Sequence, residues 1–421
     1  MADLAAPPCP AVRPITPIVL RAWTATTCAG AGRAALLDAL RDGRSGLRPN
    51  DFSRTPIAAF IGRIEGVEDA PLPGGLARWD CRNNRLAWLA LQQDGFLDAA
   101  RAAIARHGPG RVAVLIGTST SSIGASEEAY ARLAPDGGFP PDLQRPEVHT
   151  PHSLGGFVRE ALGARGPCCT VATACSSSAK VFAQAERLLR LGLVDAAVVG
   201  GVDSLCQSIL YGFHALQLVA PERCRPFDAR RQGISLAEAG GYALLERAGA
   251  DDEARSLLIG WGESSDAHHM AAPHPEGRGA ERAALDALAR AGLDAGSIDY
   301  LNLHGTATPK NDATEAAMVA RHFAAPTRAS STKGLTGHTL GAAGIVEAVI
   351  TLLALEHGFV PGSTGLDAAD AELPEAFRAL LAPAPQARPL RVALSHSFGF
   401  GGSNAVLAFA KDRAALEGAR R

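Results

Sequence analysis

A cysteine in a turn of small residues is the first candidate for chemistry in this sequence. Cys175 lies in TACSSSA (173–179), between a short apolar run typical of a strand and a helical pattern. A turn from strand to helix directs free backbone N–H groups and the positive end of a helix dipole at the sulfur, which favours the thiolate. A cysteine that only packs in the core is the competing interpretation of the same turn.

Two histidines occur in comparable surroundings further along the chain. His304 ends an apolar run (300–303) and opens the loop HGTATPKND, and His338 lies in STKGLTGHTLGAAG (331–344) together with Lys333. Active-site loops often follow strand ends in this way. A single histidine in either place could be structural, but two in glycine- and threonine-rich segments favour a catalytic function.

A glycine-rich segment, SFGFGGSN (397–404), follows the last apolar run. Its backbone can approach a ligand closely, and its N–H groups are free to bind an oxyanion. The chain has no P-loop motif, and this segment lacks the GxGxxG spacing and the following helix that dinucleotide binding requires. The segment therefore indicates oxyanion binding rather than phosphate binding.

These segments require elements that hold them in place, and the hydrophobic pattern predicts alternating strands and helices. Short apolar runs bounded by glycine (111–117, 195–201 and 242–246) suit strands buried on both faces, and helical periods lie between them. The same rhythm restarts after about residue 250, although no fixed repeat is visible. We predict an α/β protein with a flexible leader (1–13), two similar halves (14–250 and 251–412) and a tail (413–421).

Composition narrows the class of protein further. The 421 residues carry a formal net charge of -2, which gives no chain-wide reason to bind nucleic acid. The eight cysteines show no CxxC pair, so neither a zinc site nor a disulfide framework is expected. The chain shows no signal peptide and no uninterrupted apolar stretch long enough for a membrane span, which predicts a cytoplasmic protein.

Together, the four motifs resemble the elongating β-ketoacyl-acyl-carrier-protein synthases. The turn at Cys175, HGTATPKND, STKGLTGHTLGAAGIVEA and SFGFGGSN have the order and spacing of that family, and the similarity covers about residues 14–412. The resemblance implies a thiolase-like fold with five layers, αβαβα, and duplicated halves. It also implies a homodimer or a heterodimer with a related ketosynthase or chain-length factor, and no cofactor apart from the phosphopantetheine of acyl carrier protein.

In such a synthase, Cys175 carries the acyl chain while His304 and His338, as neutral imidazoles, stabilise the enolate formed when malonyl carrier protein loses carbon dioxide. The nearby charge of Lys333 disfavours protonation of either imidazole. The resemblance further assigns the oxyanion hole to the backbone N–H groups of Cys175 and Phe400, and makes Phe400 the gate of the acyl pocket.

The resemblance also assigns supporting positions. It gives pantetheine binding to Thr306 and Thr308, and a structural or orienting role to Asp312 and Glu347. It places Thr120 in the acyl pocket. Arg82 and Arg85 are candidates for docking an acidic carrier protein, with an ordinary solvated helix face as the alternative. A metal is not expected, because the adjacent histidines His268, His269 and His274 lack an acidic partner at helical spacing.

Departures from the common fatty-acid enzymes leave the substrate open. The segments CRNNRLAWLAL, ERCRPFDARRQG and SSDAHHMAAPHPEG look more like synthases of aryl-polyene or related pigment pathways. A non-catalytic chain-length factor would share the fold but usually lacks the nucleophile, which this chain retains. Thiolases place a second cysteine where this chain has SFGFGG, so a thiolase is the less favoured alternative.

Overall fold

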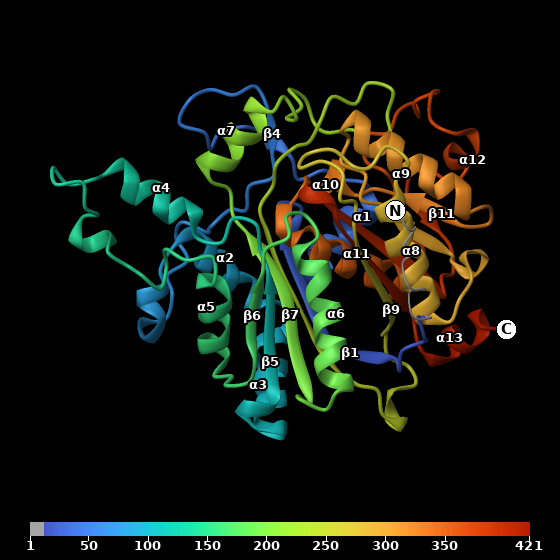
Figure 1. Cartoon of the computed structure of the whole chain (residues 1–421), viewed down its shortest axis with the longest axis horizontal. Coiled ribbons are helices and arrows are strands. Elements are labelled where there is room, and N and C mark those ends of the chain that lie inside the picture. Colours follow the sequence, from blue (N-terminus) through green and yellow to red (C-terminus); the bar gives the residue numbers. More distant parts are fainter. Residues whose placement is uncertain (1–11) are drawn as a thin grey trace, which may run out of the picture.

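The computed structural model describes residues 12–421, so nearly all of the predicted leader lies outside the described residues. Eleven strands form the main sheet, ten of them in one continuous order (Figure 1). The first half contributes β1 (Ile18–Thr27), β5 (Val112–Gly117), β6 (Cys168–Val171), β7 (Ala196–Asp203) and β8 (Ala239–Arg247). The second half contributes β9 (Leu257–Ser265), β10 (Tyr300–Asn302), β11 (Arg328–Ser330), β14 (Val392–Gly399) and β15 (Ser403–Ala410). A short β2 (Gly30–Ala31) pairs with β1 beside them.

Both halves have the same topology. Across the sheet the strands run β11-β10-β14-β15-β9-β1-β8-β7-β5-β6. If the strands of each half are numbered along the chain, their order from the outer edge of the sheet is third, second, fourth, fifth, first. The third, second and fourth strands pair in parallel. The fourth pairs with the fifth, and the fifth with the first, in antiparallel fashion. The predicted duplication is confirmed by this shared order, which no residue-level repeat in the sequence reveals.

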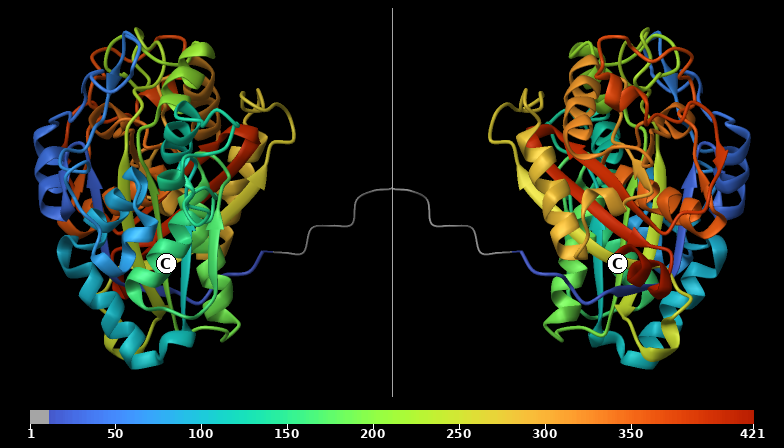
Figure 2. Two further views of the ribbon diagram at one scale, coloured as in Figure 1. Left: turned by 90° about the vertical axis from the view of Figure 1, so that its left-hand side faces the viewer. Right: turned by 90° about the vertical axis from the view of Figure 1, so that its right-hand side faces the viewer.

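Helices cover the two halves and fill the space between them. The helices are α1 (Gly32–Asp42), α2 (Arg82–Leu91), α3 (Phe96–His107), α4 (Ile123–Ala131), α5 (Ser153–Leu162), α6 (Ser177–Arg190), α7 (Gln207–Ala215), α8 (Arg278–Ala291), α9 (Pro309–His322), α10 (Lys333–Thr336), α11 (Ala343–His357), α12 (Glu375–Arg378) and α13 (Arg413–Ala419). α2, α3 and α5 pack on the outer face of the first half, and α8 and α9 pack on the second. α6 and α11 lie between the halves, which gives the predicted five layers (Figures 1 and 2).

The central helix α11 is apolar because it is surrounded by protein. Thirteen of its 15 residues are buried, and it ends where Gly358 adopts a left-handed conformation. Residues 340–357 are long and apolar enough to cross a membrane, with a mean hydropathy of 1.6, but 89% of them are buried inside the fold. A helix that is hydrophobic all round and enclosed in this way is the core helix of a soluble protein.

Two segments depart from the body of the fold or extend its edge. The arm that carries α4 stands away from the sheet on the side of β6 (Figure 1). At the other end of the chain, the segment predicted as a tail contains α13, whose Leu416 is buried against the second half. The tail is therefore part of the folded core rather than an appendage.

The contact between α6 and α11 leaves no room for an added side chain. A Cβ on Gly344 would lie 2.4 Å from the backbone nitrogen of Ala179. We expect Gly344→Ala to lower the free energy of unfolding by about 1–3 kcal/mol, because a methyl group there overpacks the two central helices. Urea denaturation measures the change.

Gly418→Ala is the matched control for this substitution. Gly418 also lies in a helix, but no atom comes within 4 Å of the position of its Cβ. This variant should leave stability unchanged or raise it by up to about 1 kcal/mol. Equal stability of the two variants would show that the α6–α11 contact is not tight.

Candidate active site

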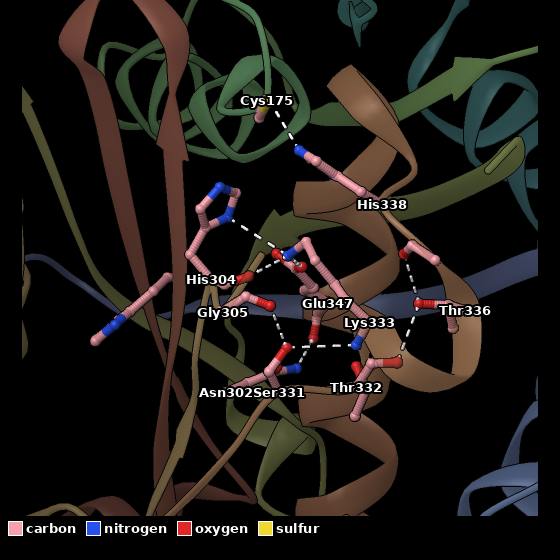
Figure 3. Close-up of polar contacts among 12 residues, drawn as sticks. Cys175, Asn302, His304, Gly305, Ser331, Thr332, Lys333, Thr336, His338 and Glu347 are labelled. Carbon is pink, nitrogen blue, oxygen red and sulfur yellow. Dashed lines mark hydrogen bonds and ion pairs between the residues drawn. The ribbon is translucent and has the colours of Figure 1, made fainter. Parts of the chain in front are cut away.

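Cys175 lies in the turn between β6 and α6, and its side chain is buried (Figure 3). The preceding residue, Ala174, has a φ of 53°, a left-handed conformation that a non-glycine residue adopts rarely. The chain therefore turns sharply here, and α6 begins at Ser177, two residues after the sulfur. The expected strand-to-helix turn is present, and the strained residue beside it is one that the sequence does not mark.

The two histidines meet the cysteine from the second half of the fold. His338 follows α10, and its Nε2 lies 3.1 Å from Cys175 Sγ. His304 follows β10, and its ring is nearly perpendicular to that of His338, with 5.5 Å between the centroids. The Cys175 sulfur and one ring nitrogen of each histidine all lie within 4.8 Å of one another. The structure thus brings together three residues that are up to 163 positions apart in the sequence.

Burial controls the protonation of the cysteine. It raises the pKa of the Cys175 thiol to about 12, whereas Lys333 and the backbone N–H of Phe400 act in the opposite direction. The expectation of a resting thiolate is therefore wrong: the effect of burial exceeds that of the groups that stabilise the anion. A neutral thiol needs a proton acceptor, and Nε2 of His338 is in position to be one.

Both histidines are neutral near pH 7. Burial lowers the pKa of His304 and of His338 well below the ordinary value, and the charge of Lys333 lowers both further. This confirms the predicted protonation state and its predicted second cause. The Lys333 ammonium lies 3.4 Å from Nδ1 of His304 and can only donate, so Nδ1 accepts and Nε2 carries the hydrogen.

Lys333 is held by two partners besides that ring. Its ammonium group donates to the carbonyl oxygen of His304 at 2.6 Å and forms an ion pair with Glu347 on α11 (Figure 3). Burial raises the pKa of the Glu347 carboxyl group to about 7, against the effect of Lys333. Glu347 is thus the direct partner of Lys333.

A cavity of about 380 Å³ opens onto the three residues. Its wall includes Phe400, Thr306 and Thr308, and the hydroxyl groups of the two threonines are 2.9 Å apart. Phe400 packs its ring against Phe213 of α7 at 5.6 Å. The cavity is large enough for an extended thioester arm, and these three predicted site residues line it.

Two other predicted residues lie away from this cavity. Asp312 is fully buried and accepts hydrogen bonds from the backbone of Phe227 and Ala307, which makes it a support for the loop after His304. Burial raises its pKa to about 7. Thr120 lines a second cavity of about 200 Å³ and donates to Asp203 at 2.6 Å.

The proposed docking arginines already have partners within the chain. Arg82 binds Glu238 and Glu68, and Arg85 binds both carboxylate oxygens of Asp80. The rings of His268 and His274, in the 266–276 loop, are 5.2 Å apart. Among the described residues, however, the close set of possible metal ligands is the trio of Cys175 and the two histidines themselves.

Three supporting residues were not predicted from the sequence. Glu315 on α9 accepts the backbone N–H groups of His304 and Gly305, and His396 on β14 contacts Glu315 in turn. Asp203 accepts hydrogen bonds from five donor groups, four within Thr118–Thr120 and the backbone N–H of Ala342. Asp203 is the last residue of a glycine-rich strand, β7, which is a weak sequence signal for a functional position. Glu315 has no such signal.

Family models match both halves of the chain. The N-terminal domain of beta-ketoacyl synthases matches residues 16–250, and the C-terminal domain matches residues 255–367. The chain belongs to the β-ketoacyl synthase family. The synthase is thus an acyltransferase that condenses acyl chains during fatty acid or polyketide elongation, with substrates carried on acyl carrier protein.

Individual relatives agree with this assignment. Nodulation protein E of Rhizobium meliloti strain 1021 is 36% identical over 71% of the synthase and 75% of its own length. The 3-oxoacyl-acyl-carrier-protein synthase 2 of Synechocystis is 33% identical over the same shares. A chain of the solved complex of the ketosynthase ApeO with its chain length factor ApeC from Xenorhabdus doucetiae has a TM-score of 0.84 and 35% identity. The match covers 94% of the synthase and 98% of that chain.

The lowered pKa values of the two histidines predict the pH dependence of decarboxylation. A lowered pKa means that the neutral imidazole persists as the pH falls. The rate of malonyl decarboxylation should therefore show no acid limb near about pH 6.5, the ordinary histidine value. Carbon dioxide release measured between about pH 8 and about pH 5.5 tests this expectation.

Glu347 titrates in the same range, so Glu347→Gln serves as a control. This variant removes the carboxyl group and leaves the charge of Lys333 next to His304. A remaining acid limb near about pH 6.5 in Glu347→Gln would show that one of the histidines protonates at its ordinary value.

Proposed function

We propose that Cys175 attacks the thioester of an acyl chain on acyl carrier protein while His338 takes the thiol proton. The 3.1 Å contact between His338 Nε2 and Cys175 Sγ carries this proposal. The acyl carbon bonds to the sulfur of Cys175, its bond to the carrier sulfur breaks, and His338 returns the proton to the departing pantetheine thiol. Both groups are neutral before and after the transfer.

Malonyl carrier protein then enters the cavity. His304, with its hydrogen on Nε2, donates a hydrogen bond to the malonyl thioester carbonyl. Once Cys175 is acylated it offers no thiol proton to His338, whose ring then takes the tautomer with hydrogen on Nε2 and donates to the same carbonyl. The bond to the carboxylate breaks, carbon dioxide leaves, and the electron pair forms an enolate that these donors stabilise. The enolate attacks the acyl carbon on Cys175, and the sulfur leaves to give a 3-oxoacyl product on the carrier protein.

The backbone N–H groups of Cys175 and Phe400 form the oxyanion hole in this proposal. The Phe400 N–H is directed at the sulfur of Cys175, where it lowers the pKa of the thiol against the effect of burial. Thr306 and Thr308 bind the pantetheine arm along the cavity wall, and Phe400 gates the acyl pocket. In this proposal the second cavity, which Thr120 lines, receives the distal end of the acyl chain. No cofactor besides the carrier's phosphopantetheine is required.

The docking site for the acidic carrier protein needs cations near the cavity mouth. Lys310 lines the cavity and forms no ion pair within the described part of the chain. Arg82 and Arg85 stay candidates, although their internal partners leave fewer of their donors for a carrier. We therefore propose Lys310 as the first cation that the carrier protein contacts. We also propose that the synthase is cytoplasmic.

We also propose that the β6 edge of the sheet is covered by a second copy of this chain, which forms a homodimer. Among the described strands β6 pairs only with β5, so its other edge offers unpaired backbone groups. Ile123, Tyr130 and Leu133 are exposed on the neighbouring arm. A chain-length factor is the alternative partner, which the ApeO complex supports.

The acyl substrate is proposed to belong to an aryl-polyene or related pathway. The segments CRNNRLAWLAL, ERCRPFDARRQG and SSDAHHMAAPHPEG support this, with a saturated fatty acid as the alternative. A scan of saturated and polyunsaturated acyl carrier proteins, with products read by mass spectrometry, tests it. Elongation of saturated chains alone would contradict it.

Substitution of the site residues separates the two half-reactions. Cys175→Ala should gain no acyl mass from any acyl carrier protein. His304→Ala should acylate almost normally but lose decarboxylation by about 100-fold or more, because it removes a donor to the enolate. His338→Ala should slow both steps, since its Nε2 also faces the thiol.

Mass spectrometry of the intact protein and release of labelled carbon dioxide measure the two steps. Lys411→Ala, at the opposite end of β14 and β15 from the Phe400 loop, is the control and should change neither. If unaltered protein acylates no chain, the non-catalytic chain-length-factor function is favoured instead.

Ultracentrifugation of the purified chain tests the proposed assembly. A mass twice the 43.5 kDa of the chain is expected for a pair of copies. A monomer that pairs only after addition of a related non-catalytic chain would support the heterodimer.

A further inference from the structure

A third histidine is buried behind the catalytic pair. His396 lies on β14 and is fully buried, and its Nδ1 is 3.0 Å from Oε1 of Glu315. A carboxylate oxygen accepts, so Nδ1 carries the hydrogen of this ring. Nε2 has no hydrogen-bond partner within the described chain. The bond to Glu315 is thus the one polar contact that fixes this ring.

Glu315 transmits that contact to the loop of His304. Its Oε1 accepts the backbone N–H of His304 at 2.8 Å, and its Oε2 accepts that of Gly305 at 2.7 Å. The three donors hold the carboxylate in one orientation. The backbone of His304 is therefore anchored on one side by Glu315, while Lys333 binds the carbonyl of the same residue on the other.

The ring of Phe398 is a second connection between His396 and His304, besides Glu315. The ring of Phe398 lies 5.4 Å from that of His396 and 5.7 Å from that of His304. Both His396 and Phe398 belong to β14, which leads into the Phe400 loop. A change in the position of His396 therefore reaches His304 through its backbone anchor and through the ring that it packs against.

We propose that His396 is a positioning residue for decarboxylation, which acts by donating Nδ1–H to Glu315 and so holding His304 in place. This rests on the proposed function of His304 as a donor to the enolate. His396 does not line the cavity, and its effect on His304 passes through Glu315 and through Phe398.

Substitutions of His396 distinguish this role from simple packing. His396→Leu fills the space but cannot donate, so Glu315 loses one of its three donors and His304 is less firmly held. Malonyl decarboxylation should fall roughly 10- to 100-fold, as small misplacements of a catalytic group do. Acylation of Cys175 should stay close to the unaltered rate, since His304 does not touch the thiol proton.

His396→Asn is the conservative variant. The amide nitrogen of asparagine lies near the position of Nδ1 and can donate to Glu315, so decarboxylation should return close to the unaltered rate. His322→Leu is the matched control: His322 forms another histidine–glutamate pair, with Glu281, near the far end of α9. This variant should change neither rate.

The outcomes separate the possibilities. Equal loss of acylation and decarboxylation in His396→Leu, no loss in either, or failure of asparagine to restore the rate would overturn the proposal. If His396→Leu does not fold, as judged by thermal unfolding, Glu315→Gln replaces it, because the amide leaves one backbone N–H without an acceptor. An unaltered protein that neither acylates nor decarboxylates would instead overturn the proposed function itself.

Discussion

A single buried ammonium group sets the chemistry of the whole site. Lys333 is 2% exposed, and two contacts offset the cost of burying its charge: the ion pair with Glu347 and the hydrogen bond to the His304 carbonyl. The same charge lowers the pKa of both histidines and opposes the effect of burial on Cys175. Removal of either partner would leave an uncompensated buried charge, so the ion pair and the site form a unit.

The duplicated architecture explains why these groups meet. Cys175 directly precedes the central helix of the first half, and Glu347 lies on the equivalent central helix of the second. The close approach at Gly344 brings the two helices together, and the loops that precede them converge at the same end. Neither half contains the complete site, because Cys175 belongs to one and His304 and His338 belong to the other.

The sequence predicts the parts of this site that carry local signals. Cys175, His304 and His338 each stand in a glycine- or threonine-rich turn beside an apolar run, which physical reasoning can recognise. Glu315 and His396 meet across 81 positions, and nothing in the residues around either indicates that contact. The sequence also predicts the wrong charge for the thiol. A strand-to-helix turn indicates a helix dipole that favours the thiolate. It does not indicate that the second half of the fold buries the sulfur and so raises the pKa of the thiol.

Burial of all three groups suits a reaction whose charge appears only transiently. The thiol and both imidazoles are neutral at rest, so the site holds no cation on the histidines that would bind the malonyl carboxylate too tightly to lose it as carbon dioxide. Negative charge then develops on the thioester oxygen, where neutral N–H donors in a poorly hydrated cavity interact with it more strongly than in water. The arrangement therefore favours the enolate over the charged substrate, and it does so only while His304 is held in the geometry that Glu315 and Lys333 impose.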